Sequence, residues 1–169
     1  MKLRLPKIPL IRPAERYVSA SSGKCNLGDS SYKNYDRGNA PSIFNLDAIT
    51  RENENYRTAL WTGEGMQITV MSIPTGSGIR NENHDNIDQL LKIVSGTGEV
   101  TMKKGDGRSH LTTPVKEGDA IMIPRGTWHS LKNTGRSPMK LYSVYAPKNH
   151  PYGTVHKTES DADGAEHSE

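Results

Sequence analysis

Short runs of apolar and β-branched residues, rather than helical repeats, dominate the chain from Tyr56 onward. Within each run the apolar and polar side chains alternate in part, which is the pattern of strands that bury one face. No run with the helical period extends beyond about two turns in this region. We therefore predict strands over residues 57–62, 66–73, 90–95, 99–103, 119–123, 127–131 and 139–145.

Glycine, proline and aspartate separate these runs and predict tight corners between the strands. The Asp106–Gly107 pair stands where a hairpin is expected to reverse. Residues 45–50 are expected to form one short helical turn. Many short strands joined by such corners are typical of an all-β sandwich or barrel.

The two ends of the chain differ from the middle in amino-acid composition. Residues 1–45 are rich in Ser, Asn, Gly and Lys, and we expect an extended arm that is partly disordered. The apolar residues with which this arm could pair with a sheet edge are Leu3, Leu5, Ile8, Leu10 and Ile11. Residues 157–169 are small and acidic, and we expect a disordered tail. The predicted organisation is therefore an arm, one barrel over residues 46–156, and this tail.

The bulk composition narrows the classes of function. The chain has 169 residues, a length expected for one domain, and its hydrophobic fraction of 33% is low for a compact domain. Its formal charge of +3 is too small to predict nucleic acid as a partner. The single cysteine, Cys25, cannot form an intrachain disulfide, and no apolar stretch has membrane-spanning or secretory length. We expect a cytoplasmic protein without a membrane partner.

Two segments of the chain carry side chains of the types that can bind metal ions. Glu82 and His84 are two residues apart, so both side chains face the same side of an extended backbone. Gln89 follows at the start of the next apolar run, and His129 follows a Pro-x-Gly corner at residues 124–126. If the strands close into a barrel, these side chains reach one interior.

The spacing of these residues resembles the paired motifs of the cupin superfamily. The first family motif is Gly, five residues, His-x-His, three or four residues, Glu, six residues and Gly. Residues 76–96 keep every spacing, but Glu82 replaces the first His and Gln89 replaces the Glu. The second motif is Gly, five residues, Pro-x-Gly, two residues, His, three residues and Asn, and residues 118–133 match it at every position.

The resemblance covers roughly residues 56–156 and implies a double-stranded β-helix, the jelly-roll barrel of the cupins. Residues 142–158 are similar to a subgroup of stand-alone cupins labelled mannose-6-phosphate isomerase-like. That label fixes no activity, because one fold hosts many functions. The resemblance also implies a homodimer, since cupins commonly pair through sheet faces.

The resemblance further implies one divalent metal ion. By position, the four family ligands fall on Glu82, His84, Gln89 and His129. Two imidazoles and one carboxylate suit Fe(II), and Mn, Ni, Co and Zn are also compatible. Asp88 is a rival for the third position, but Asp88 and Gln89 adjoin on an extended chain and face opposite ways. The spacing to Gly96 favours Gln89.

Three functions stay open at this point. The first is a metalloenzyme, an isomerase or a dioxygenase, acting on a small polar metabolite such as a sugar or keto compound. The second is a non-catalytic module that binds a small ligand, and the third is a dimeric scaffold. The apolar wall of the pocket is expected to include Ile68, Val70, Ile93, Met122 and Leu141. Tyr142 or Tyr145 would add a polar group, and we interpret His150 as a surface residue.

Overall fold

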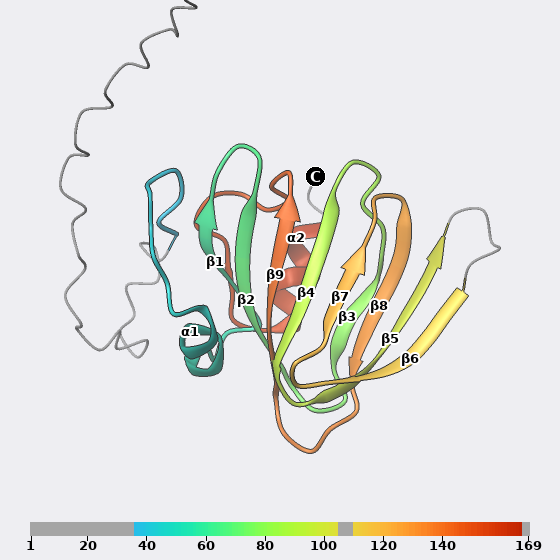
Figure 1. The fold of residues 1–169 in the computed structure, drawn as a ribbon. Coiled ribbons are helices and arrows are strands. Elements are labelled where there is room, and N and C mark those ends of the chain that lie inside the picture. Colours follow the sequence, from blue (N-terminus) through green and yellow to red (C-terminus); the bar gives the residue numbers. More distant parts are fainter. Residues whose placement is uncertain (1–35, 105–109, 167–169) are drawn as a thin grey trace, which may run out of the picture.

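The computed structural model of the chain describes residues 36–104 and 110–166 (Figure 1). Its strands are β1 (Arg57–Thr62), β2 (Gln67–Ile73), β3 (Gly78–Glu82), β4 (Asp88–Ser95), β5 (Thr97–Lys104), β6 (His110–Lys116), β7 (Ala120–Ile123), β8 (Thr127–Asn133), β9 (Met139–Ala146) and β10 (Val155–His156). Its helices are α1 (Leu46–Glu52) and α2 (Glu159–Glu166). The predicted reversal at Asp106–Gly107 and the apolar residues of the arm between Leu3 and Ile11 lie outside the described residues.

Two antiparallel sheets form the barrel. The six-stranded sheet has the order β10-β1-β2-β9-β4-β7, and the four-stranded sheet has the order β3-β8-β5-β6. Strands that are distant in sequence pair directly, because β2 pairs with β9 and β3 pairs with β8. Figure 1 shows the two sheets wrapped against each other. This double-stranded β-helix confirms the predicted fold class.

The hydrophobic core lies between the two sheets and consists of alternate residues of their strands. In the six-stranded sheet, Met71, Leu141 and Ile93 form one inward row across β2, β9 and β4. In the facing sheet, Leu131 of β8 lies between Ile79 and Val100. Burial of each such side chain contributes about 1.5–3 kcal/mol. This part of the barrel therefore supplies much of the free energy that stabilises the fold.

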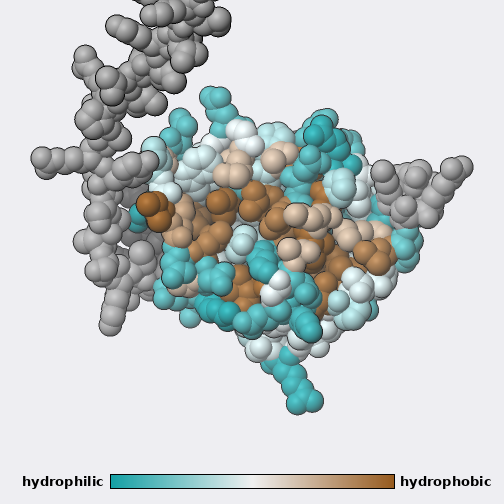
Figure 2. All heavy atoms as spheres, viewed as in Figure 1, coloured by the Kyte–Doolittle hydropathy of each residue, from teal (hydrophilic) through white to brown (hydrophobic). Residues whose placement is uncertain are grey.

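The outer face of the six-stranded sheet carries a second apolar row. Its cross-strand neighbours are Trp61, Ile68, Val144, Leu90 and Met122, one from each of β1, β2, β9, β4 and β7. Figure 2 shows apolar side chains as a brown band over this face. Helix α1 packs over another part of the same face, on β2, β9 and β4, but Met122 remains 64% exposed. An antiparallel sheet that faces water usually alternates apolar with polar positions, so this row is a candidate contact surface.

Two of the residues predicted for the apolar wall of the pocket face the barrel interior, and the other three face outward. Ile93 and Leu141 lie in the core. Ile68 and Met122 belong to the outer row, and Val70 shares their side of the sheet, because it lies two residues from Ile68 on β2. Strand parity decides the side, and a shift of one residue inverts it.

The acidic end of the chain forms a helix where we expected disorder. Helix α2 begins after Thr158, whose hydroxyl accepts a hydrogen bond from the backbone N–H of Asp161 at 3.3 Å. Ala162 of α2 is 4% exposed and belongs to the core cluster. Arg80 of β3 forms an ion pair with Asp163 at 2.8 Å. The cap, one buried alanine and this pairing with β3 hold a segment whose composition alone predicts no order.

The remaining elements agree with the predicted ones only in part. The expected turn at residues 45–50 is α1, and the Asn45 side chain caps it by accepting from the backbone N–H of Ala48 at 3.1 Å. Strands β3, β6 and β10 are not among the predicted strands. Strand β6 contains Pro114, which is tolerated because β6 lies at a sheet edge. No helix within the described ranges is long and apolar enough to cross a membrane.

Candidate metal centre

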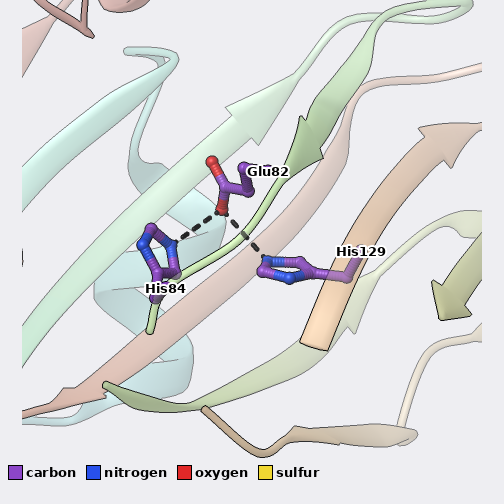
Figure 3. Close-up of side chains that lie close together, drawn as sticks. All are labelled: Glu82, His84 and His129. Carbon is purple, nitrogen blue, oxygen red and sulfur yellow. Dashed lines mark hydrogen bonds and ion pairs between the residues drawn. The ribbon is translucent and has the colours of Figure 1, made fainter. Parts of the chain in front are cut away.

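Glu82, His84 and His129 converge inside the barrel, as Figure 3 shows. The Glu82 Oε1 atom lies 3.3 Å from His84 Nε2 and 3.1 Å from His129 Nε2. One potential ligand atom from each of the three residues lies within 4.8 Å of the other two. Glu82 ends β3 and is the direct cross-strand partner of His129 on β8. The three residues therefore form a group that could hold a metal ion.

Backbone contacts hold the His129 imidazole and the segment that carries His84. The His129 Nδ1 atom lies 3.0 Å from the carbonyl oxygen of Thr127, and His129 is 1% exposed. The backbone N–H of Gly126 donates to the carbonyl oxygen of His84 at 2.8 Å. Gly126 has a φ of +73°, a conformation that favours glycine. The Pro-x-Gly corner thus ties the strand of His129 to the segment that carries His84.

The contacts of His129 call for a cation between it and Glu82. A carbonyl oxygen can only accept, so the hydrogen of the neutral ring is on Nδ1, next to Thr127. The Nε2 atom then presents a lone pair to the Glu82 oxygen, which is also an acceptor, at 3.1 Å. This contact is favourable when a proton or a metal ion lies between the two atoms. A histidine whose second nitrogen is held by a carbonyl is the usual arrangement of a metal ligand.

The environment of Glu82 keeps its carboxyl group ionised. Burial alone would raise the pKa of Glu82, but His129 and His84, when a ring proton lies between each imidazole and the carboxylate, outweigh burial and hold the pKa well below its usual range. The site therefore offers an anionic oxygen between two imidazole nitrogens. Such a mixed set of oxygen and nitrogen donors suits first-row divalent metals.

Gln89 and Asp88 lie on opposite sides of β4, as strand parity predicts. Gln89 is 4% exposed, and its Nε2 group donates to the Ser143 hydroxyl at 3.1 Å. Its Oε1 atom is buried and finds no hydrogen-bond partner among the described residues. Asp88 is exposed and accepts from the backbone and the guanidinium of Arg125, and these hydrogen bonds lower the pKa of Asp88. A buried amide oxygen without a partner is costly, so Gln89 fits a site that receives a cation or a ligand.

His150 is half-buried beside the site rather than a surface residue, a position that sequence reasoning did not predict. Its Nε2 atom lies 3.2 Å from the Tyr145 hydroxyl, and the two rings meet edge-on with centroids 5.1 Å apart. The Tyr145 ring in turn lies edge-on to the His84 ring, with centroids 6.1 Å apart. Burial, together with the charge of Arg57, lowers the pKa of His150 to about 3. Tyr142, the other candidate, faces the outer side of the sheet beside Val70.

The amide of Gln67 holds His150 in this position. Its Oε1 atom accepts from the backbone N–H groups of His150 at 2.8 Å and Asn149 at 3.2 Å. Its Nε2 group donates to the carbonyl oxygen of His150 and to the Thr62 hydroxyl, both at 2.9 Å. Gln67 and His150 are 83 residues apart, so no local pattern places His150 in the site. The available sequence signal is a glutamine at the start of a strand that is rich in apolar and β-branched residues.

Known proteins resemble this chain in sequence and in structure. Residues 69–145 match the cupin domain family. The chain is 47% identical over 131 residues to the uncharacterised protein YrkC of Bacillus subtilis (strain 168), covering 78% of this chain and 70% of that protein. The crystal structure of BH2720 from Bacillus halodurans has a TM-score of 0.74 at 44% identity, covering 77% of this chain and 98% of that chain.

A more distant likeness is to part of a larger enzyme. Over 82 residues the chain is 30% identical to mannose-1-phosphate guanylyltransferase of Salmonella montevideo, which is 48% of this chain but 16% of that enzyme. The cupin domain match over residues 69–145 contains all four of the candidate ligands predicted from the motifs. Together with the two-sheet topology and the likeness to BH2720 over nearly its whole length, these matches show that the chain belongs to the cupin family.

Proposed function

We propose that this cupin holds one divalent metal ion through Glu82, His84, Gln89 and His129 and acts on a small polar metabolite. The observation that carries the proposal is the carboxylate oxygen of Glu82, 3.3 Å and 3.1 Å from the two imidazole nitrogens. When bound there, a metal ion supplies Lewis acidity toward a ligand oxygen, or a site for dioxygen. Isomerase and dioxygenase chemistry are both compatible with this role.

The proposed ligands contribute to holding the ion in different ways. Glu82 supplies negative charge, and His129 is oriented by its contact with Thr127. Gln89 supplies a neutral amide oxygen, a weaker donor than a carboxylate, and the Ser143 hydroxyl holds the amide so that this oxygen is free. Because two imidazoles, one carboxylate and one amide leave positions open to a substrate, Mn, Fe, Ni, Co and Zn remain the candidate ions.

Two different walls flank the proposed ion. On the four-stranded sheet, Met102 is the cross-strand neighbour of His129, and Leu111 is the neighbour of Met102. On the other side, Tyr145 of β9 and His150, in the segment that follows β9, present polar groups. A site with one apolar and one polar wall suits a small metabolite that has both kinds of surface.

A non-catalytic ligand-binding module is the second candidate. The amide of Gln89 favours it, because an amide in place of a carboxylate weakens the hold on a metal ion. Turnover assays on metal-loaded protein, with sugar phosphates and with dioxygen-dependent substrates, separate the two functions. Turnover that depends on the metal supports the enzyme, and binding without turnover supports the module.

Metal content tests the proposal directly. We expect the wild-type protein to bind about one equivalent of a divalent metal ion, measured by elemental analysis after loading and desalting. His129→Ala is expected to lose the ion, whereas His110→Ala, which removes an exposed histidine of β6, is expected to keep it. A chelator is expected to lower the melting temperature of the wild type and to leave that of His129→Ala unchanged. Equal metal content in wild type and His129→Ala would contradict the proposal.

The homodimer is a separate proposal, supported by the outer apolar row of the six-stranded sheet. A face of this kind can pair with its own copy by two-fold symmetry, and it contains Trp61 and Met122, residue types that are enriched in interfaces. Val144→Lys, at the centre of the row, is expected to shift the mass measured by light scattering from dimer to monomer. Thr101→Lys, on the other sheet, is the control. A wild-type monomer would contradict this proposal. The cytoplasmic location and the lack of nucleic-acid partners remain predictions.

A further inference from the structure

One row of side chains on the inward side of the four-stranded sheet leads from the candidate metal centre to the surface. His129, Met102 and Leu111 are cross-strand neighbours on β8, β5 and β6, so they share one side of the sheet. His129 is 1% exposed, Met102 packs partly buried against the core cluster, and Leu111 is 48% exposed. Neighbouring strands lie about 4.8 Å apart, which places Leu111 roughly 10 Å from His129 across the sheet.

The exposure of Leu111 marks an opening of the barrel and is not explained by its place on an edge strand alone. Val115 lies four residues further along the same edge strand and on the same inward side, yet it is 7% exposed and belongs to the core cluster. Leu111 is level with Met102 and His129, whereas Val115 is level with Gly98. The barrel interior is therefore closed beside the core and open beside the candidate metal centre.

The lining of this opening is apolar and uncharged. The inward positions of residues 98–102 on β5 and of residues 111–115 on β6 carry no charged side chain. On the six-stranded sheet, Ile123 of β7 is the cross-strand neighbour of Gln89 and belongs to the core cluster. Tyr145 lies on the opposite side of Gln89, on β9. A ligand group that points toward β5 and β6 thus gains by being apolar, and a charged group there would lose water without finding a partner.

We propose that Met102 and Leu111 form an apolar subsite for the tail of a ligand whose oxygen binds the metal ion. The ligand class is a carboxylate or keto compound with an uncharged aliphatic chain of about three to five carbons, a length that extends from the ion toward Leu111. Leu111 is then a specificity residue, and a second charge at the far end of the ligand is disfavoured. The inference rests on the proposed metal site and goes beyond it by naming the form of the ligand.

Acetate, butyrate and hexanoate share one carboxylate and differ in chain length, so they are the probes. Each is titrated into the cobalt-loaded wild type, and binding at the ion is followed by the change in its visible absorption. We expect the affinity to rise roughly two- to fourfold with each added CH₂ group, as for burial of apolar surface. Adipate, in which a second carboxylate ends the six-carbon chain, is expected to bind about as weakly as acetate. These comparisons need no variant.

A variant then locates the subsite. Leu111→Gln nearly keeps the size of the side chain and replaces its apolar end, at a position that is already 48% exposed. We expect it to lower the ratio of hexanoate to acetate affinity at least about threefold and to leave acetate and cobalt binding unchanged. Thr112→Gln is the matched control, because Thr112 is exposed and faces the opposite side of β6. It is expected to behave as wild type.

The outcomes separate this inference from the metal site. Equal affinities of the wild type for acetate and hexanoate, while cobalt is bound, would overturn the apolar subsite and leave the metal site standing. An unchanged ratio in Leu111→Gln, or an equal fall of the ratio in Thr112→Gln, would also overturn it. If the wild type does not bind cobalt at all, the proposed metal site is overturned, and the inference falls with it.

Discussion

The same three strands carry apolar side chains at one end of the barrel interior and polar side chains at the other end. At one end, the inward row across β2, β9 and β4 is Met71, Leu141 and Ile93. Four residues further along each strand, the inward row is Gln67, Tyr145 and Gln89. The first row packs as core, whereas the second carries hydrogen-bonding groups beside the candidate metal centre. Residues for stability and residues for chemistry are therefore separated along each strand rather than assigned to different elements.

The largest expected effect comes from opening a cavity in the apolar end. Leu141 is 0% exposed, and we expect Leu141→Ala to lower the free energy of unfolding by about 2–5 kcal/mol. Urea denaturation measures this loss. Thr101→Ala, on the four-stranded sheet and partly exposed, is the control, with an expected loss of about 1 kcal/mol or less. If the two variants were equally stable, the apolar end would not be the source of stability.

At the polar end, we expect a substitution to change metal affinity more than it changes the free energy of unfolding. His84→Ala is expected to weaken metal binding by more than about 100-fold, since loss of even an outer partner of a ligand costs 10–100-fold. The metal-free variant is expected to unfold within about 1 kcal/mol of the wild type, because few core contacts are lost. Metal titration and urea denaturation measure the two quantities. Wild-type metal affinity in His84→Ala would remove that histidine from the site.

The sequence was sufficient for the parts of the fold and site that depend on strand parity and short-range spacing. Strand β1 has the bounds predicted, and Glu82 and His129 meet as the motif spacing implies. The orientation of Gln89 followed from its adjacency to Asp88, because neighbours on a strand face opposite sides. Ile68 was predicted to face the barrel interior because it is apolar, but it faces outward. Strand parity alone does not say which of the two sides of a strand faces the core.

Features that depend on long-range contacts could not be predicted from the sequence. Strand β3 is short and largely polar, and its place is set by pairing with β8. Helix α2 is held against β3 by contacts that include the ion pair of Arg80 with Asp163 and by burial of Ala162. His150 enters the site because Gln67 binds its backbone from 83 residues away. None of these partners is adjacent to the segment that it positions.

A gradual effect is expected from pH, and it separates the polar end from the core. The pKa of His150 is about 3 in the folded chain against an ordinary value of 6.5, so the unfolded chain binds more protons between these values. The stability due to neutral His150 is therefore present above pH 6.5 and is lost as the pH falls toward 3. We expect the metal-free protein to lose at most about 1.4 kcal/mol per pH unit in this window. His150→Gln is expected to show a shallower slope in urea denaturation, and equal slopes would contradict this role.

The central claim is that the barrel interior holds one ion between Glu82, His84 and His129. The most direct test is a crystal structure of the cobalt-loaded protein with anomalous scattering recorded at the cobalt edge. We predict one anomalous peak at roughly 2.0–2.3 Å from the Glu82 oxygen and both imidazole Nε2 atoms, with the Gln89 Oε1 atom turned toward it. A peak elsewhere, or no peak with the carboxylate still hydrogen-bonded to both rings, would contradict it.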